Sequence, residues 1–115
     1  MTNRESQLLA ILRIGHEASI RGAGISLSEA LTRNGYRDLR SGFGPEDLLP
    51  VIKTHPTLAE AWLAYSEDKR TDGGWYLLEQ GAIGRVGGSQ SEMRFGSLDE
   101  AVAEYVVREL DFWAS

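Results

Sequence analysis

Apolar residues in the first 70 positions recur every three or four residues, the spacing that places them on one side of an α-helix. A glycine or a proline follows each such stretch within a few positions, and both residues end helices. The pattern therefore predicts four helices, at about Asn3–Ser19, Leu27–Arg33, Pro45–Lys53 and Leu58–Lys69.

The starts of helices carry signals of their own. At four places a glutamate follows a serine or threonine by three residues, so that each side chain can accept a backbone N–H of the first turn. These pairs are Thr2 and Glu5, Ser26 and Glu29, Thr57 and Glu60, and Ser97 and Glu100. A fifth start is expected at Gly44-Pro45, because proline in the first turn lacks only an N–H that would have no partner there. The last pair predicts a further helix from about Leu98 to Phe112.

The helical spacing of apolar residues ends at Asp72-Gly73-Gly74. Short aromatic and apolar runs follow, and glycine-rich turns separate them. Three strands are expected there: about five residues from Trp75, then Ala82–Val86 and Glu92–Phe95. The predicted fold class is α+β, with a helical N-terminal half (1–70) followed by a three-stranded antiparallel β-meander and a closing C-terminal helix (71–115). Because 115 residues suffice for one core, we expect a single domain over 1–115.

Composition narrows the class of protein. Hydrophobic residues make up 42% of the chain and charged residues 25%, which is typical of a globular protein. No apolar run is long enough to span a membrane, and the first residues lack the pattern of an export signal, so we expect a cytoplasmic protein. Cysteine is absent, which excludes disulfides and thiol chemistry and agrees with a reducing compartment.

The formal net charge of −5 arises in the C-terminal part of the chain. Residues 1–70 carry nine basic and nine acidic side chains, whereas residues 71–115 carry three basic and eight acidic ones. A field of this sign repels the phosphates of nucleic acids and attracts basic protein surfaces. A solvated face that serves only solubility would give the same pattern.

Residues that could carry chemistry are few. His16 and His55 are the only histidines, and neither has a nucleophile or a metal-ligand spacing beside it. The glycine-rich segment 81–88 lacks the Gly-Lys-Ser/Thr ending of a phosphate loop, so hairpin turns explain it better. Glu100 and Glu104 lie one helical turn apart, but an arginine one turn further on indicates surface ion pairs. We therefore expect no catalytic residue, no metal site, no cofactor and no small-molecule substrate.

A nucleic-acid-binding regulator is the alternative hypothesis. Two short helices around Asn34-Gly35 would imitate a helix-turn-helix that carries Arg33, Arg37 and Arg40. Acidic residues dilute this patch, and a pI near 5.0 is not the electrostatic footprint of a DNA-binding domain.

Four C-terminal segments carry a likeness to a known family: Gly74–Glu79, Gly84–Val86, Phe95–Ala101 and Tyr105–Leu110. Their order of strand, turn and Phe-x-Ser-x-x-Glu-Ala helix start resembles the small bacterial immunity proteins that neutralise polymorphic toxins, including those of contact-dependent growth inhibition. The likeness covers residues 74–115 and does not extend to the first 70. It implies a cytoplasmic protein that binds a toxin domain and blocks its active site without catalysis of its own. Many such toxins are nucleases with basic clefts.

The resemblance and the acidic surplus lead to the same hypothesis, a protein that neutralises a cognate toxin domain and has no nucleic-acid or membrane partner. Trp75 and its neighbour on the strand must face opposite ways, so one of the two offers an outward aromatic anchor. The candidate partner-binding residues are Asp72, Tyr76, Glu79, Glu92, Glu104 and Asp111.

The capping pair ahead of the last helix yields a first prediction. Ser97→Ala should lower the free energy of unfolding by about 0.5–2 kcal/mol, because the helix loses the hydroxyl that accepts a backbone N–H of its first turn. Urea or thermal melts would measure the change. An unaltered melt would mean that the helix begins elsewhere.

Overall fold

The computed structural model describes residues 3–18, 25–68, 73–88 and 92–114. Its helices are α1 (Asn3–Leu12), α2 (Ile14–Ala18), α3 (Leu27–Arg33), α4 (Tyr36–Leu39), α5 (Pro45–Thr54), α6 (Thr57–Asp68) and α7 (Leu98–Ala114), and a 3₁₀ turn, η1 (Arg40–Gly42), follows α4. Its strands are β1 (Trp75–Leu78), β2 (Ala82–Arg85) and β3 (Met93–Arg94), in an antiparallel sheet of order β1-β2-β3. The predicted α+β class is thereby confirmed: N-terminal helices, a three-stranded meander and a closing helix.

The first predicted helix is divided in two, and the packing of Trp62 from α6 explains where. Its indole N–H donates to the carbonyl of Leu12 at 2.8 Å. In a continuous helix this carbonyl would accept the backbone N–H four residues further on, so the helix is interrupted here. The Trp62 ring also lies against α2, where a Cβ added to Gly15 would come within 2.7 Å of it. The predicted end of that helix, Ser19, lies outside the described residues.

The other boundaries that the structure describes agree with the predicted ones to within a few residues, and the predicted end of the fourth helix, Lys69, lies outside the described residues. Helix α3 has the predicted bounds and ends ahead of Gly35, whose φ of 64° is the left-handed conformation that glycine tolerates. Helix α7 continues past the expected end to Ala114. Strand β3 is shorter than expected, because its register with β2 pairs only Met93 and Arg94.

In two of the four predicted capping pairs the serine hydroxyl accepts a backbone N–H as expected. The backbone N–H of the paired glutamate donates to Ser26 Oγ at 3.1 Å and to Ser97 Oγ at 3.2 Å. Thr57 is itself the first residue of α6, and Thr2 lies outside the described residues. The start of α5 at Gly44-Pro45 is confirmed, and the carboxylate three residues on accepts the N–H of the glycine at 2.8 Å.

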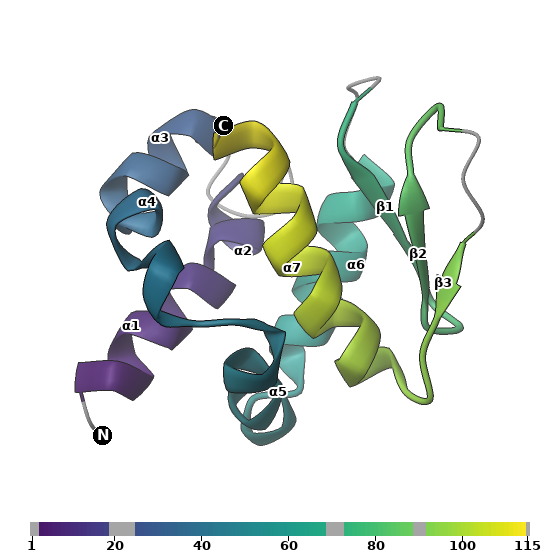
Figure 1. Cartoon of the computed structure of the whole chain (residues 1–115), viewed down its shortest axis with the longest axis horizontal. Helices are drawn as coiled ribbons and strands as arrows, with labels where there is room; N and C mark the ends of the chain where they lie inside the picture. The colour runs from purple at the N-terminus through teal and green to yellow at the C-terminus, as the bar shows by residue number, and fades with distance from the viewer. Residues whose placement is uncertain (1–2, 19–24, 69–72, 89–91, 115) are drawn as a thin grey trace.

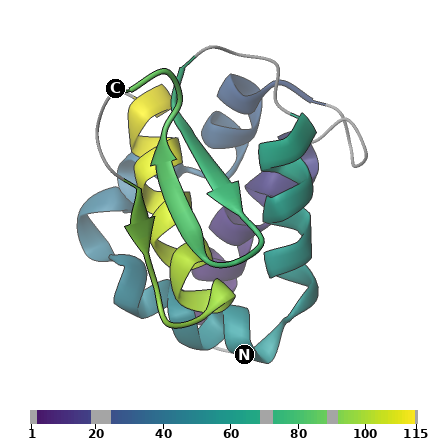
Figure 2. The same cartoon turned by 90° about the vertical axis from the view of Figure 1, so that its right-hand side faces the viewer.

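Helix α7 runs through the middle of the molecule, with the sheet on one side and α3 and α4 on the other (Figure 1). Figure 2 shows the sheet in front of α6 and α7, so that one face of the sheet is covered by helices. Side chains from both halves of the chain are enclosed in one core, among them Ile11, Leu12, Ile52, Trp62, Tyr105, Val106 and Leu110. No helix in the described part of the chain is long and apolar enough to cross a membrane.

The outer edge of β1 is paired by side chains of two helices instead of a fourth strand. Trp75 donates its backbone N–H to Glu109 at 2.7 Å, and its carbonyl accepts the hydroxyl of Tyr105 at 3.0 Å. Ser66 of α6 accepts the N–H of Leu77 at 2.8 Å and donates to the Leu77 carbonyl at 3.3 Å. Backbone groups that an edge strand leaves open are thus satisfied inside the protein.

Glu109 is fully buried, with 0% exposure. Besides the N–H of Trp75 it accepts the hydroxyl of Tyr65, on α6, at 2.7 Å. Burial and then the negative charge of Glu109 raise the pKa of Tyr65 above its ordinary value, so the hydroxyl keeps its proton and remains a donor. The carboxylate thereby joins α6, α7 and β1 at one point.

Removal of this carboxylate should destabilise the fold strongly. Glu109→Ala leaves the Tyr65 hydroxyl and the Trp75 N–H without this acceptor at a site closed to water, and we expect a loss of about 2–4 kcal/mol in urea unfolding. Glu109→Gln keeps one acceptor oxygen and should cost less. Glu60→Ala, on the exposed side of α6, is the control and should stay within about 0.5 kcal/mol. Equal effects at Glu109 and Glu60 would contradict the assignment.

Candidate partner-binding surface

The outer face of the sheet brings together two of the predicted site residues. Tyr76 is the outward member of the aromatic pair, whereas Trp75 packs against the core. The hydroxyl of Tyr76 donates to Oε1 of Glu92 at 2.8 Å, and this bond raises the pKa of Tyr76 above its ordinary value. The ring crosses Gly84 of β2, where any Cβ would collide with it, so this arrangement requires glycine there.

The remaining predicted residues are spread along the C-terminal part. Glu79 is exposed in the turn between β1 and β2, and Asp72 lies outside the described residues. Glu104 is on α7 and accepts the Nε–H of Arg108 at 2.9 Å, which confirms the ion pair expected from their spacing. None of these contacts joins Glu79 or Glu104 to the Tyr76–Glu92 pair.

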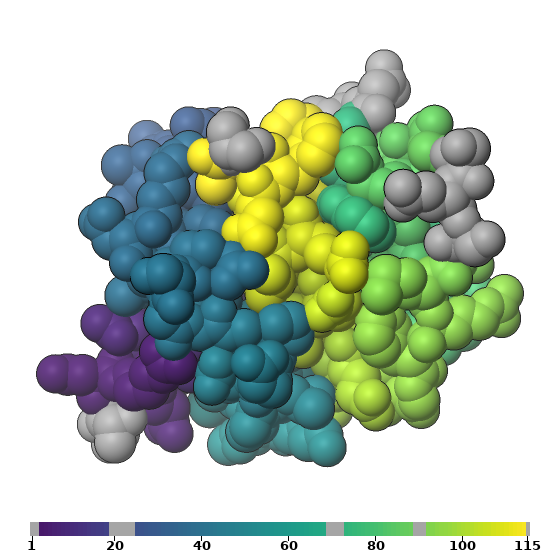
Figure 3. Space-filling view, in the orientation of Figure 1, coloured from purple at the N-terminus to yellow at the C-terminus, as the bar shows by residue number. Residues whose placement is uncertain are grey.

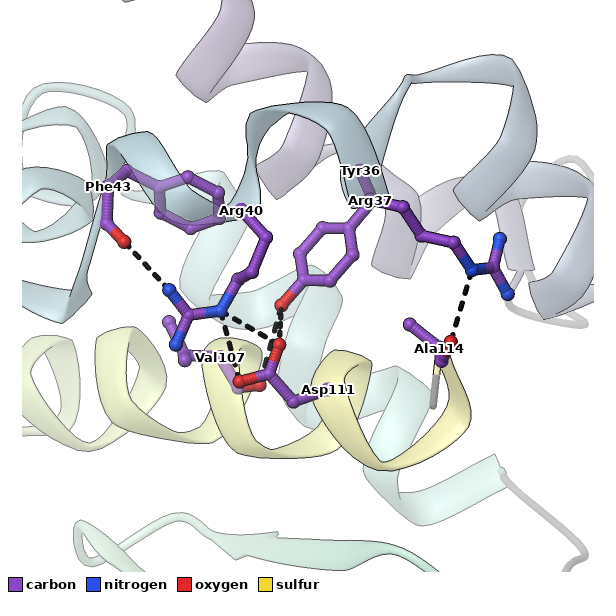
Figure 4. A network of polar contacts seen from close by, with 7 residues as sticks. All are labelled: Tyr36, Arg37, Arg40, Phe43, Val107, Asp111 and Ala114. Atoms are coloured by element: carbon purple, nitrogen blue, oxygen red, sulfur yellow. Dashed lines mark hydrogen bonds and ion pairs between the residues drawn. The ribbon is translucent and has the colours of Figure 1, made fainter.

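Asp111 points toward α4 and η1 and belongs to a network within the protein (Figure 4). Arg40 donates its Nε–H to both carboxylate oxygens of Asp111, at 2.8 and 3.0 Å, and reaches the carbonyl of Phe43 at 2.8 Å. The buried Tyr36 donates its hydroxyl to Oδ1 of Asp111 at 2.7 Å. Burial first, and then this carboxylate, raise the pKa of Tyr36. Asp111 therefore has a structural role in joining α7 to the N-terminal half.

Two of the three arginines of the nucleic-acid hypothesis, Arg37 and Arg40, are held in the same region, whereas Arg33 is exposed at the end of α3. Arg40 pairs with Asp111, and Arg37 donates its Nε–H to the carbonyl of Ala114 at 3.1 Å, near the end of α7 (Figure 4). Cations at this position offset the negative end of the helix dipole. Helix α4 has four residues, about one turn, which is too short to lie along a DNA groove as a recognition helix does. The two short helices expected on either side of Asn34-Gly35 are present as α3 and α4, and the alternative function itself stays a prediction.

A groove lies where the start of α5 meets the first turns of α7 and the end of β3, and no sequence pattern predicts it. Figure 3 shows the beginning of α5 and the first half of α7 next to each other on one face. Three glutamates line the groove, Glu46, Glu100 and Glu104, and no basic residue is among its described lining. Its apolar lining consists of Pro45, Leu49, Phe95 and Ala103. Of these residues only Glu104 is a candidate from the sequence.

The three glutamates differ in how far they are engaged. Glu46 is exposed and forms no hydrogen bond or ion pair with another described residue. Glu100 accepts the hydroxyl of Ser97 at 3.3 Å, and the side chain of Glu104, which is 22% exposed, pairs with Arg108. The groove therefore has carboxylate oxygens that can accept further hydrogen bonds beside an apolar surface.

Residues with possible catalytic chemistry stand apart from this groove. His16 is exposed on α2, and His55 follows α5 with its Nδ1 3.1 Å from the carbonyl of Val51. Within the described ranges no cluster of three or more His, Cys, Asp or Glu side chains could hold a metal ion. The chemistry that the surface offers is that of charge, hydrogen bonding and aromatic contact.

Comparisons with protein-family models, with curated proteins and with solved structures found no match for this chain.

The Asp111 network yields a prediction about stability. Asp111→Ala should cost about 1–2 kcal/mol, mainly because the buried Tyr36 hydroxyl loses its short hydrogen bond and keeps only the carbonyl of Val107, at 3.5 Å, as an acceptor. The Arg40–Asp111 pair adds little, because its side chains are 36% and 41% exposed and solvent screens them. A double-mutant cycle with Tyr36→Phe, followed by urea unfolding, measures the coupling between the two residues. Additive effects in that cycle would refute the structural role.

Proposed function

We propose that this protein is an immunity protein, which binds a cognate bacterial toxin domain and blocks its active site. The groove between α5 and α7 receives a basic side chain of the toxin. The observation that carries this proposal is the groove's lining, with three glutamates beside an apolar surface. Such a lining suits arginine or lysine, whose alkyl part packs on apolar residues while the charged head meets carboxylates.

The charge around the groove favours a basic protein over a nucleic acid. Residues 71–115 carry eight acidic and three basic side chains, so phosphates are repelled as they approach. A toxin nuclease holds phosphates in a basic cleft, and that cleft is complementary to an acidic surface. The resemblance of residues 74–115 to immunity proteins supports the same class of partner.

The contact surface extends from the groove over the neighbouring strand. Phe95 follows β3 and lines the groove, whereas Glu92 precedes β3 and bonds to Tyr76 on the outer face of the sheet. A partner that extends from the groove over β3 would also meet the half-buried Tyr76 and the carboxylate of Glu92. Tyrosine is common among the residues that dominate the energetics of protein interfaces.

The partner can be sought in the neighbouring reading frame. If the proposal is right, the product of that frame co-purifies with this protein and loses its toxic activity when the two are mixed. Retention of the isolated protein on DNA-cellulose at low salt, without such a complex, would favour the nucleic-acid hypothesis instead.

Charge reversal in the groove tests the mode of binding. Glu46→Lys, Glu100→Lys and Glu104→Lys, singly and together, should lower the association rate with the toxin and flatten its dependence on salt, because salt screens long-range attraction. For the triple variant we expect a loss of about tenfold or more in affinity. The rates would be measured by stopped-flow or surface-based kinetics over a series of salt concentrations.

A matched variant separates the groove from net charge. Glu29→Lys, Asp38→Lys and Glu60→Lys together change the net charge equally at exposed positions outside the groove. Neutral Glu→Gln variants of the groove avoid placing a cation at a helix start. If the control triple weakens binding as much as the groove triple, the groove is not the contact.

A further inference from the structure

Arg85, at the end of β2, is held between aromatic rings and has no carboxylate partner among the residues that the structure describes. Its guanidinium carbon lies 4.8 Å from the ring centre of Phe112 and 5.7 Å from that of Trp75. Its Nε is enclosed and has no hydrogen-bond acceptor among the described residues, whereas its two terminal Nη groups are not enclosed. No ion pair joins Arg85 to any other residue that the structure describes.

Nearby arginines differ from Arg85 in this respect. Arg94, on the adjacent strand, lies 3.6 Å from a carboxylate oxygen of Glu92, and Arg108 is paired with Glu104. The enclosed Nε is a buried donor that no partner molecule can reach, but the two Nη groups of Arg85 are open to an acceptor. The aromatic rings offset the cost of the charge, but they accept no directed hydrogen bond as a carboxylate does.

Rigid elements hold Arg85 in place. Trp75 is its cross-strand neighbour on β1, and Phe112 projects from α7. On α7 the guanidinium carbon of Arg108 lies 5.0 Å from the Trp75 ring, and its Nε–H meets Glu104. A continuous row of contacts therefore leads from the groove, through Glu104, Arg108 and Trp75, to Arg85.

We infer that Arg85 binds a carboxylate of the protein partner, from an aspartate or glutamate side chain. The planar guanidinium presents paired donors that match a carboxylate, and the flanking rings restrict its orientation before the partner arrives. An arginine with aromatic neighbours is also the composition of residues that dominate protein interfaces. The acidic surroundings oppose a doubly charged phosphate more than a single carboxylate.

This inference rests on the proposed function only in taking the partner to be a protein. The two contacts require opposite charges on the partner, a basic side chain at the groove and an acidic one at Arg85. Contacts of opposite sign at the two ends of one surface fix the orientation in which the partner docks.

The site can be tested on the isolated protein with a small carboxylate. We would titrate it with N-acetyl-glutamate α-amide at constant ionic strength and follow the Arg85 Nε–H and the Trp75 indole signals by NMR. Saturable shifts with a Kd in the millimolar range, on the order of 1–50 mM, are expected for one such contact. Inorganic phosphate, titrated in the same way, should bind more weakly.

Variants assign the binding to Arg85. Arg85→Gln should weaken binding of the carboxylate about tenfold or more. Arg85→Lys keeps the charge but loses the paired donors of the guanidinium, and it should weaken binding to a smaller extent. Arg94→Gln, which removes an exposed arginine of the adjacent strand, should leave the Kd unchanged. If Arg85→Gln does not fold, the Arg85→Lys titration decides. Unsaturable shifts, an unchanged Kd in the Arg85 variants or tighter binding of phosphate would each overturn the inference, whatever the fate of the toxin complex.

Discussion

The carboxylate of Glu109 lies where α6, α7 and β1 meet, and the position of the sheet depends on it. Burial of a charged group is expensive, but two short hydrogen bonds of 2.7 Å offset this cost, from the Tyr65 hydroxyl and the Trp75 N–H. The second bond pairs the open edge of β1 with a helix side chain. Because alternate residues of a strand point to opposite faces, anchoring Trp75 toward the helices leaves Tyr76 on the outer face.

In the folded protein the acidic side chains of the C-terminal part have several different roles. Glu109 is part of the core, and Asp111 ties α7 to α4 and η1 through Arg40. Glu100 and Glu104, earlier on the same helix, line the groove. The acidic residues of α7 look alike in the sequence, but their side chains project from different sides of the helix and therefore have different roles. Only some of them remain for a partner, and Asp111 is mostly engaged within the protein.

Local signals account for the parts of the fold that could be predicted. A capping pair such as Ser97 and Glu100 or an apolar period acts over three or four residues, so the helices, the meander and the order of elements follow from the sequence. The contacts of Glu109 join residues 34 and 44 positions apart, and a glutamate on an amphipathic helix is ordinarily exposed. The groove could not be predicted for the same reason. The sequence shows acidic residues at the starts of both helices, but no local spacing indicates that α5 packs on α7.

The two ends of the proposed contact surface act over different distances. The net negative field reaches about 8 Å into physiological salt and therefore steers a basic partner before contact. The attraction of Arg85 for a carboxylate acts only once the surfaces meet, and the same negative field opposes it until then. On this proposal a strongly acidic protein would be repelled before it could use Arg85, and a purely basic one would leave the guanidinium without an acceptor. The surface that we propose would select a basic protein that carries one acidic residue at the matching position, and specific neutralisation of a single toxin would require this kind of discrimination.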